Sequence, residues 1–397
     1  MFWTRRIACY RTGGAPEVHP STDAVAIFRR ACGWALLVCM LSACAPGPLL
    51  SYRSDQPPTV NLPLAAAGVT DQRRAFGALF AKELQASKLG SGDDTRIWLH
   101  GVSGEAAASA QSSTRAAFTA HAGETSVILV PGLFGDCLGV YAMPFGDGIE
   151  YPRGSPANAA YQRYADLGLR DIHMAVLPGR ASSAANGVRL AAQIRDAAAK
   201  PGVKHIVLVA YSKGVADSLN ALEVLRSNGG IPPQVQALVS VAGTVMGSPV
   251  ADYFESVYAS VSPHLTPLAC TPSEGGDVAS VTRHERVAWL AEHSLPEGIA
   301  YYSIVAFMPP GEMAPALRPS ARMLAAIDPR NDGQVLAADA IFPRGTLLAE
   351  VRADHWSVAL PRTEHPNLLM RAASSGAPFP QEVLLRSTLV WVVGGLP

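Results

Sequence analysis

The residues best suited to chemistry surround one serine, Ser212. The pentapeptide Ala-Tyr-Ser-Lys-Gly at 210–214 follows an apolar run and precedes a helical stretch over 215–225. A strand that turns directly into a helix brings the residues around the serine close together, and Ala210 and Gly214 are small enough for that turn. The turn would lift the Ser212 hydroxyl above a sheet edge, at a helix N-terminus whose dipole favours negative charge. The segment predicts a nucleophile, although a serine that merely caps a helix has the same sequence surroundings.

A serine hydroxyl is a weak nucleophile and needs a general base. Five histidines follow Ser212 in the chain: His264, His284, His293, His355 and His365. His355 ends the last strand-like run, where a loop can return an imidazole to the sheet edge, so we expect it to be the base. His365 is the second choice, because His284 and His293 lie on a helical stretch.

The acid that orients this base is expected in an Asp-Gly turn. Asp332 precedes Gly333 after a strand and a short helix, and such a turn would project a carboxylate from a sheet edge. Asp328 and Asp354 are rivals, and a plain turn has the same sequence. In this set, the histidine would take the serine proton, and the aspartate would hold the imidazole and stabilise its cation.

A tetrahedral intermediate also needs backbone N–H donors for its oxyanion. One is expected from Lys213, directly after the serine, and the other from Leu133, with Phe134 in reserve. Leu133 lies in a Gly-Leu-Phe-Gly segment after a strand-like run, where the glycines let the backbone turn its amides inward. We expect the Lys213 side chain at the surface, with contact to an anionic substrate as the alternative. Segment 243–249 is expected to line the acyl pocket.

Around these residues, apolar runs alternate with helical stretches. The runs that read as strands cover 126–130, 172–177, 205–210, 235–241, 299–307 and 347–351, and helices are predicted over 184–199, 215–225 and 381–393. Runs that are apolar without alternation suit strands buried on both faces of a parallel sheet. The sequence therefore predicts a three-layer α/β domain with a mostly parallel central sheet and flanking helices.

Three other segments complete this organisation. A helix is predicted from about Thr70, with Thr70 or Asp71 as its cap, and a short strand is predicted over 97–99. The regular alternation of strands and helices is interrupted at about 250–298. Aromatic residues and a helix over 283–293 predict an inserted cap or lid there. Such a cap would carry the substrate preference.

The turn around Ser212, the Asp-Gly turn at Asp332 and the late His355 resemble the α/β-hydrolase family, in particular its serine esterases and lipases. The resemblance covers about 96–397, with Ala210 where the family pattern has glycine. It implies a carboxylic-ester hydrolase that forms an acyl-enzyme with a small-molecule or lipid ester. An envelope acyltransferase on the same fold is an alternative, and a non-catalytic binding lipoprotein is another.

The first 43 residues are typical of an export signal. Arg29 and Arg30 precede an apolar stretch of 13 residues, and Leu-Ser-Ala-Cys at 41–44 resembles the bacterial lipobox, in which the cysteine is lipidated. Ala45 after Cys44 implies, by that resemblance, an outer-membrane lipoprotein that faces the periplasm or the surface. A transmembrane anchor is the alternative.

The expected order of segments follows from this signal. The signal peptide would cover 1–43, with an n-region long enough to suggest a start near Val25, and a lipid-attached tether would cover 44–69. The N-terminal helix and loop would occupy 70–95, followed by the hydrolase domain over 96–397.

Composition excludes several other classes. The 397 residues are 49% hydrophobic, so a large core can form and a disordered chain is excluded. The formal net charge is zero and no run of Lys or Arg exceeds two residues, which argues against nucleic-acid binding. We find no metal-ligand pattern and no glycine-rich nucleotide motif, so no metal and no cofactor are expected. Beyond the lipobox, only Cys137 and Cys270 remain, and export would allow them to form a disulfide.

Overall fold

The computed structural model describes residues 64–87, 95–101, 108–135, 168–169, 171–261, 273–360, 372 and 376–397. All of them belong to the larger of two compact units, Pro48–Pro397. The expected signal peptide, Cys44 and most of the tether lie outside the described residues, as do Cys137 and Cys270. Each helix within the described ranges is too short or too polar to span a lipid bilayer.

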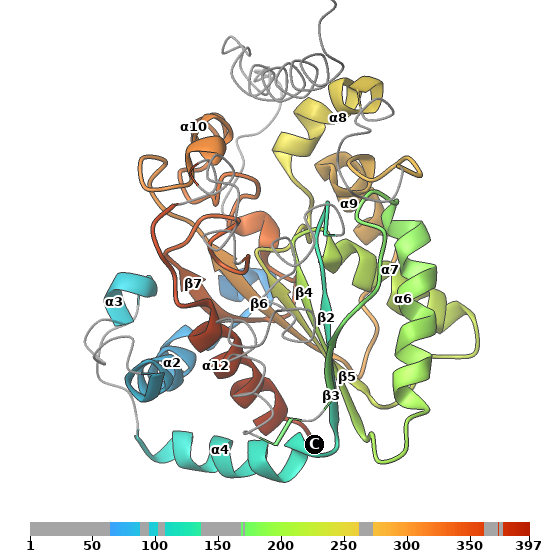
Figure 1. The fold of residues 1–397 in the computed structure, drawn as a ribbon, viewed down its shortest axis with the longest axis vertical. Coiled ribbons are helices and arrows are strands. Elements are labelled where there is room, and N and C mark those ends of the chain that lie inside the picture. The colour runs from blue at the N-terminus through green and yellow to red at the C-terminus, as the bar shows by residue number, and fades with distance from the viewer. Residues whose placement is uncertain are drawn as a thin grey trace, which may run out of the picture. The chain divides into compact units, whose positions relative to one another are not determined.

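A seven-stranded parallel sheet forms the centre of this unit in the described residues (Figure 1). The strand order is β1-β7-β6-β5-β4-β2-β3, and every neighbouring pair is parallel. The strands are β1 (Thr70–Asp71), β2 (Thr125–Val130), β3 (Asp171–Met174), β4 (His205–Tyr211), β5 (Val235–Val241), β6 (Ala300–Ala306) and β7 (Thr346–Val351). All positions of β2 and β4 are buried, which explains why their sequences are apolar without alternation.

Helices cover both faces of the sheet (Figure 1). One face packs against α6 (Ser183–Ala198) and α7 (Gly214–Ser227). The other packs against α2 (Arg73–Ser87), α4 (Ala108–Ala122) and α12 (Gln381–Gly394). The predicted three-layer α/β architecture is confirmed.

The chain between β5 and β6 contains α8 (Pro249–Val261), the 3-10 turn η5 (Ala279–Val281) and α9 (Arg283–Glu292). The described part of this segment contains no strand, as its sequence predicts. Trp289 and Leu290 of α9 pack against the core on the side of α6 and α7. That this insertion covers a substrate site stays a prediction.

Short helices occupy the chain between β6 and β7. They are η6 (Pro315–Leu317), α10 (Arg318–Ala325) and η7 (Ala338–Ala340), and a further 3-10 turn, η1 (Leu64–Ala67), precedes β1. In the view of Figure 1, α8 and α10 lie beyond the upper end of the sheet, and α4 lies at the level of its lower end.

One predicted element is wrong, and another begins slightly later than expected. The strand expected over 97–99 is replaced by α3 (Thr95–Trp98), because Leu99 N–H bonds to Thr95 O at 2.8 Å and closes a helical turn. The helix expected after a cap at Thr70 or Asp71 begins at Arg73, whose N–H donates to Asp71 Oδ1 at 3.1 Å. Thr70 N–H donates to Gly345 O at 2.9 Å, so Thr70 extends the sheet beside β7 as β1.

Candidate active site

Ser212 lies at the junction of β4 and α7 with a left-handed backbone, φ 53°. Non-glycine residues adopt this conformation at a cost, and it is held only where the surroundings enforce it. A Cβ on Gly214 would lie 2.6 Å from the carbonyl oxygens of Val130 and Pro131, so only glycine fits there. The strand–helix junction therefore presses against the end of β2, which is the physical reason for the small residues around Ser212.

The position of Ser212 in the sheet matches the general location of ligand sites in α/β folds. β2 has β3 on one side and β4 on the other, so the chain reverses direction across the sheet at this point. Crevices at the carboxyl ends of strands flanking such a reversal are where α/β proteins bind ligands. Ser212 follows β4, and the segment with Gly132 and Leu133 follows β2 at the same edge. A Cβ on Gly132 would lie 2.9 Å from Ser212 Cβ.

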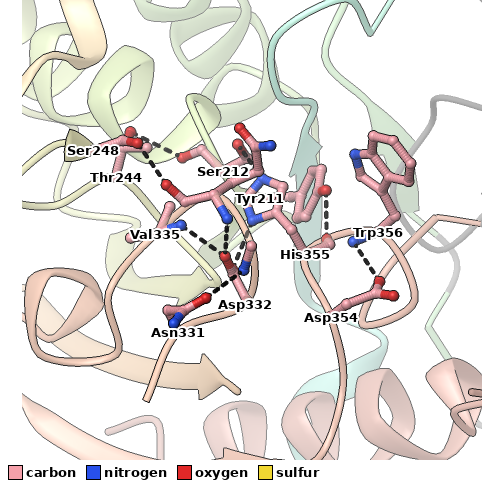
Figure 2. Close-up of polar contacts among 12 residues, drawn as sticks. Tyr211, Ser212, Thr244, Ser248, Asn331, Asp332, Val335, Asp354, His355 and Trp356 are labelled. Atoms are coloured by element: carbon pink, nitrogen blue, oxygen red, sulfur yellow. Dashed lines mark hydrogen bonds and ion pairs between the residues drawn. The ribbon is translucent and has the colours of Figure 1, made fainter. Parts of the chain in front are cut away.

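His355 and Asp332 complete a hydrogen-bonded line with Ser212 (Figure 2). Ser212 Oγ lies 2.9 Å from His355 Nε2, and His355 Nδ1 lies 2.7 Å from Asp332 Oδ2. The three residues are 8%, 6% and 1% exposed, respectively. The structure thus brings together the three residues that the sequence nominates, from the ends of β4 and β7 and from the loop after α10.

The loop that carries Asp332 is shaped by its own backbone. Asp332 Oδ1 accepts from Gln334 N–H at 2.8 Å and from Val335 N–H at 2.7 Å. Gly333 has φ +92°, a conformation that glycine adopts readily. In addition, His355 N–H donates to Asp332 O at 2.8 Å. One carboxylate oxygen therefore organises the turn, and the other is left for the imidazole.

The rival acids and bases lie elsewhere or have other partners. Asp328 pairs with Arg330 at 2.8 Å. Asp354 is fully buried, and its carboxylate accepts from backbone N–H groups of Ala314, Trp356 and Ser357. The two His355 ring nitrogens pair with Asp332 and Ser212, not with these carboxylates. The histidine given as second choice, at 365, lies outside the described residues, as does the histidine at 264.

The two expected oxyanion donors are unpaired in the part of the chain that the structure describes. Neither Lys213 N–H nor Leu133 N–H has an acceptor there. The reserve donor, Phe134, is committed, because its N–H donates to Gly179 O at 3.0 Å. Leu133 is partly buried and packs against a small apolar cluster that includes Ala216 of α7.

The Lys213 side chain does not lie at the surface, which corrects the sequence-based expectation. It is 2% exposed, and its Nζ lies 2.6 Å from Asp217 Oδ1. Asp217 Oδ2 in turn accepts from Asn186 Nδ2 of α6 at 2.8 Å. Lysine is seldom fully buried unless it is paired. Asp217, one helical turn after Lys213, was the sequence signal that could have predicted this buried pair.

Sequence reasoning missed two residues that hold this site. Thr244 donates to the Ser212 carbonyl from both its N–H, at 3.2 Å, and its hydroxyl, at 3.3 Å. Tyr211 donates its hydroxyl to His355 O at 2.6 Å (Figure 2). Thr244 belongs to the segment expected to line an acyl pocket, and Tyr211 is the variable position of the pentapeptide. Because successive side chains of a strand point to opposite faces of the sheet, the position of Tyr211 in β4 could have indicated that it points away from α7.

No group of three or more histidine, cysteine, aspartate or glutamate side chains in the described ranges could hold a metal ion.

Several solved structures resemble this one. The metagenomic carboxyl esterase MGS0156 superposes with a TM-score of 0.69 at 30% identity, over 86% of this chain and 97% of its own. Mature lipase BlEst2 of Bacillus licheniformis gives a TM-score of 0.44 at 22% identity, over 59% of this chain and 86% of its own. Lipase 1 of Pelosinus fermentans gives 0.45 at 14% identity, over 69% of this chain and 99% of its own. No protein-family model and no curated protein matches the chain.

Proposed function

The chain belongs to the α/β-hydrolase family, with a carboxyl esterase among its relatives, and we propose that it hydrolyses carboxylic esters with Ser212, His355 and Asp332 as its catalytic triad. The observation that carries this proposal is the continuous hydrogen-bonded line from Ser212 Oγ through the imidazole to Asp332 Oδ2, at 2.9 and 2.7 Å. Distances in this range allow direct proton transfer.

The proton positions follow from the chemistry of the three groups. A carboxylate only accepts hydrogen bonds, so the imidazole proton belongs on Nδ1, facing Asp332. Nε2 then presents a lone pair to the Ser212 hydroxyl. The positive φ of Ser212 and the N-terminus of α7 direct the hydroxyl to the edge of the sheet, where negative charge is favoured.

The reaction then has two halves. Ser212 Oγ attacks the ester carbonyl as His355 Nε2 takes its proton, and the oxyanion accepts hydrogen bonds from the N–H groups of Lys213 and Leu133. The intermediate collapses as the imidazolium returns the proton to the leaving alcohol, which leaves the acyl group on the serine. A water molecule then attacks the acyl-enzyme with the same histidine as base and releases the carboxylic acid.

Labelling with a fluorophosphonate probe tests this proposal. Wild type should react covalently and hydrolyse a short p-nitrophenyl ester, and Ser212→Ala should do neither. Ser218→Ala is a matched control, because Ser218 is also buried on α7 but donates to Gly214 O at 2.7 Å. Folded wild type that neither labels nor hydrolyses esters would exclude the proposal.

We also propose that the protein is exported and anchored to the cell envelope through a lipid on Cys44. The support is the sequence alone, namely the apolar stretch that ends in Leu-Ser-Ala-Cys at 41–44. Metabolic labelling with an alkyne fatty acid should tag the wild type and not Cys44→Ser. Unlabelled protein that stays in the membrane fraction with its N-terminus intact would indicate a transmembrane anchor instead.

A further inference from the structure

One side chain connects the strand that carries the nucleophile with the loop that carries the base. Tyr211, directly before Ser212, is 3% exposed and donates its hydroxyl to the carbonyl oxygen of His355 at 2.6 Å. The two rings lie against each other, with centroids 5.2 Å apart and planes inclined by 36°.

The pleat of β4 determines this placement. Successive side chains of a strand point to opposite faces, so Ala210 faces α6 and α7 while Tyr211 faces α2 and α12. The His355 loop, which follows β7, approaches from the same face as Tyr211. Ala210, two positions before Ser212, is small and leaves room at the turn. Tyr211, directly before Ser212, is large and reaches the loop that carries His355.

The backbone of His355 is fixed at both of its polar groups. Its N–H donates to Asp332 O at 2.8 Å, and its carbonyl accepts from the Tyr211 hydroxyl. In the turn that follows, Val358 N–H donates to Asp354 O, and Leu360 N–H donates to Trp356 O. Two fixed points on the peptide set the direction of the Cα–Cβ bond, and hence the place of the imidazole between Ser212 and Asp332.

We propose that Tyr211 is a positioning residue for the proposed hydrolysis: its hydroxyl holds the His355 carbonyl, so that Nε2 stays aligned with Ser212 Oγ through both halves of the reaction. The inference rests on the proposed function, because alignment matters only if His355 transfers protons. Misplacing a reacting group by about 1 Å can cost roughly 100-fold in rate. The loss of one anchor, with the bonds to Asp332 intact, should cost less.

The competing explanation is that the hydroxyl only satisfies a buried carbonyl, and the chain offers a matched control for it. Tyr301 of β6 is also buried and donates its hydroxyl to a backbone carbonyl, Pro296 O, at 3.1 Å. Tyr301→Phe removes the same kind of bond away from the triad. Both substitutions keep the ring and remove one oxygen atom.

We expect Tyr211→Phe to lower kcat for a p-nitrophenyl ester about 10-fold, with KM unchanged within about twofold. The second-order rate constant for fluorophosphonate labelling should fall by a similar factor, because labelling needs the same serine and base. Tyr301→Phe should lower Tm by a comparable amount and leave kcat within twofold of wild type. Placing 4-aminophenylalanine at 211 restores a donor on the same ring and should recover most of the lost kcat.

A Tyr211→Phe variant that matches Tyr301→Phe in kcat overturns the inference, as does a 4-aminophenylalanine variant that stays at the level of Tyr211→Phe. If Tyr211→Phe does not fold, 3,5-difluorotyrosine at 211 provides the test, because its hydroxyl loses its proton at lower pH than tyrosine. That variant should show a fall in kcat at alkaline pH that wild type lacks, and identical profiles overturn the inference. Ser212→Ala distinguishes failure of the Tyr211 inference from failure of the proposed function. If Ser212→Ala retains hydrolysis, the proposed function itself has failed.

Discussion

Thr244 holds the carbonyl of Ser212 with two hydrogen bonds, one from its backbone N–H at 3.2 Å and one from its hydroxyl at 3.3 Å. Val215 N–H adds a third at 3.2 Å. A left-handed backbone at a non-glycine residue costs about 1–3 kcal/mol and needs surroundings that enforce it. Thr244, in the loop after β5, thus helps to maintain the strained conformation from which Ser212 projects its hydroxyl.

Replacing Thr244 with valine tests this relationship, because the shape is kept and only the hydroxyl is lost. We expect the unfolding free energy to fall by about 1 kcal/mol, and kcat to fall severalfold because Ser212 is less firmly held. Thr388→Val in α12 is the control, since Thr388 is also buried and donates to a backbone carbonyl, Leu384 O, at 2.7 Å. Equal kcat losses in the two variants would contradict a specific role for Thr244. Urea denaturation and ester hydrolysis measure the two effects.

The identity of the acid is tested by Asp332→Asn. The amide can present its N–H₂ group to Nδ1, which favours the imidazole tautomer with the proton on Nε2, facing Ser212, so that the base is lost. We expect kcat to fall by roughly 10⁴-fold, as for the same change in a serine protease triad. Asp328→Asn should stay within about twofold of wild type, because Asp328 pairs with Arg330. If Asp328→Asn shows the larger loss, the acid has been assigned to the wrong residue.

The sequence predicted those parts of the fold that depend on local pattern. Unbroken apolar runs predicted β2, β4 and β5 because strands covered on both faces need apolar side chains everywhere. The approach of Ser212, Asp332 and His355 could be predicted because parallel strands bring their carboxyl ends to one edge.

The errors arose where distant partners decide the structure. Thr70 forms β1 because β7 offers it a carbonyl at Gly345, and no local signal reveals that partner. The Lys213 side chain is buried because Asp217 replaces its hydration, and Asn186 of α6 donates a hydrogen bond to Asp217 in turn. Hydropathy alone places a lysine at the surface.

The unfolding free energy should carry a pH dependence from Asp339. Burial raises the pKa of Asp339 to about 6, and the negative charges of Asp252 and Asp328 add to the rise, while Arg283 opposes it. The folded protein therefore binds a proton between about pH 4 and 6 that the unfolded chain has lost, so this contribution to stability falls as pH rises through that window. Above pH 6, the buried charge costs on the order of 2–3 kcal/mol.

Asp339→Asn should remove this dependence. Relative to wild type, the free energy of unfolding of this variant should be larger at pH 8 than at pH 4.5, as measured by urea denaturation. Asp328→Asn is a control of opposite sign, because Arg330 lowers the pKa of Asp328. The stabilisation from Asp328 is present at neutral pH and lost in acid, so its replacement should be costlier at pH 8. Parallel profiles for wild type and Asp339→Asn would contradict the prediction.

Removing Lys213 and removing Asp217, which form a buried ion pair, should lower the free energy of unfolding by different amounts. Both side chains are 2% exposed, so a charge left without its partner is costly, at about 3–5 kcal/mol. Arg286 is also buried, and attraction to Asp217 opposes the burial that lowers the pKa of Arg286 to about 10. Asp217 thus attracts two buried cations, and Glu285 also attracts Arg286.

Lys213→Met leaves Asp217 with Arg286 as its counter-ion and with the amide of Asn186. Asp217→Asn instead leaves buried Lys213 without its bonded anion, and leaves Arg286 with the attraction of Glu285. We therefore expect Asp217→Asn to cost about 3–5 kcal/mol of unfolding free energy and Lys213→Met clearly less. Lys204→Met is the control, because Lys204 is 65% exposed in its pair with Glu124, and such surface pairs contribute about 0–1 kcal/mol. A larger loss in Lys213→Met than in Asp217→Asn, measured by urea denaturation, would mean that Arg286 does not share the charge of Asp217.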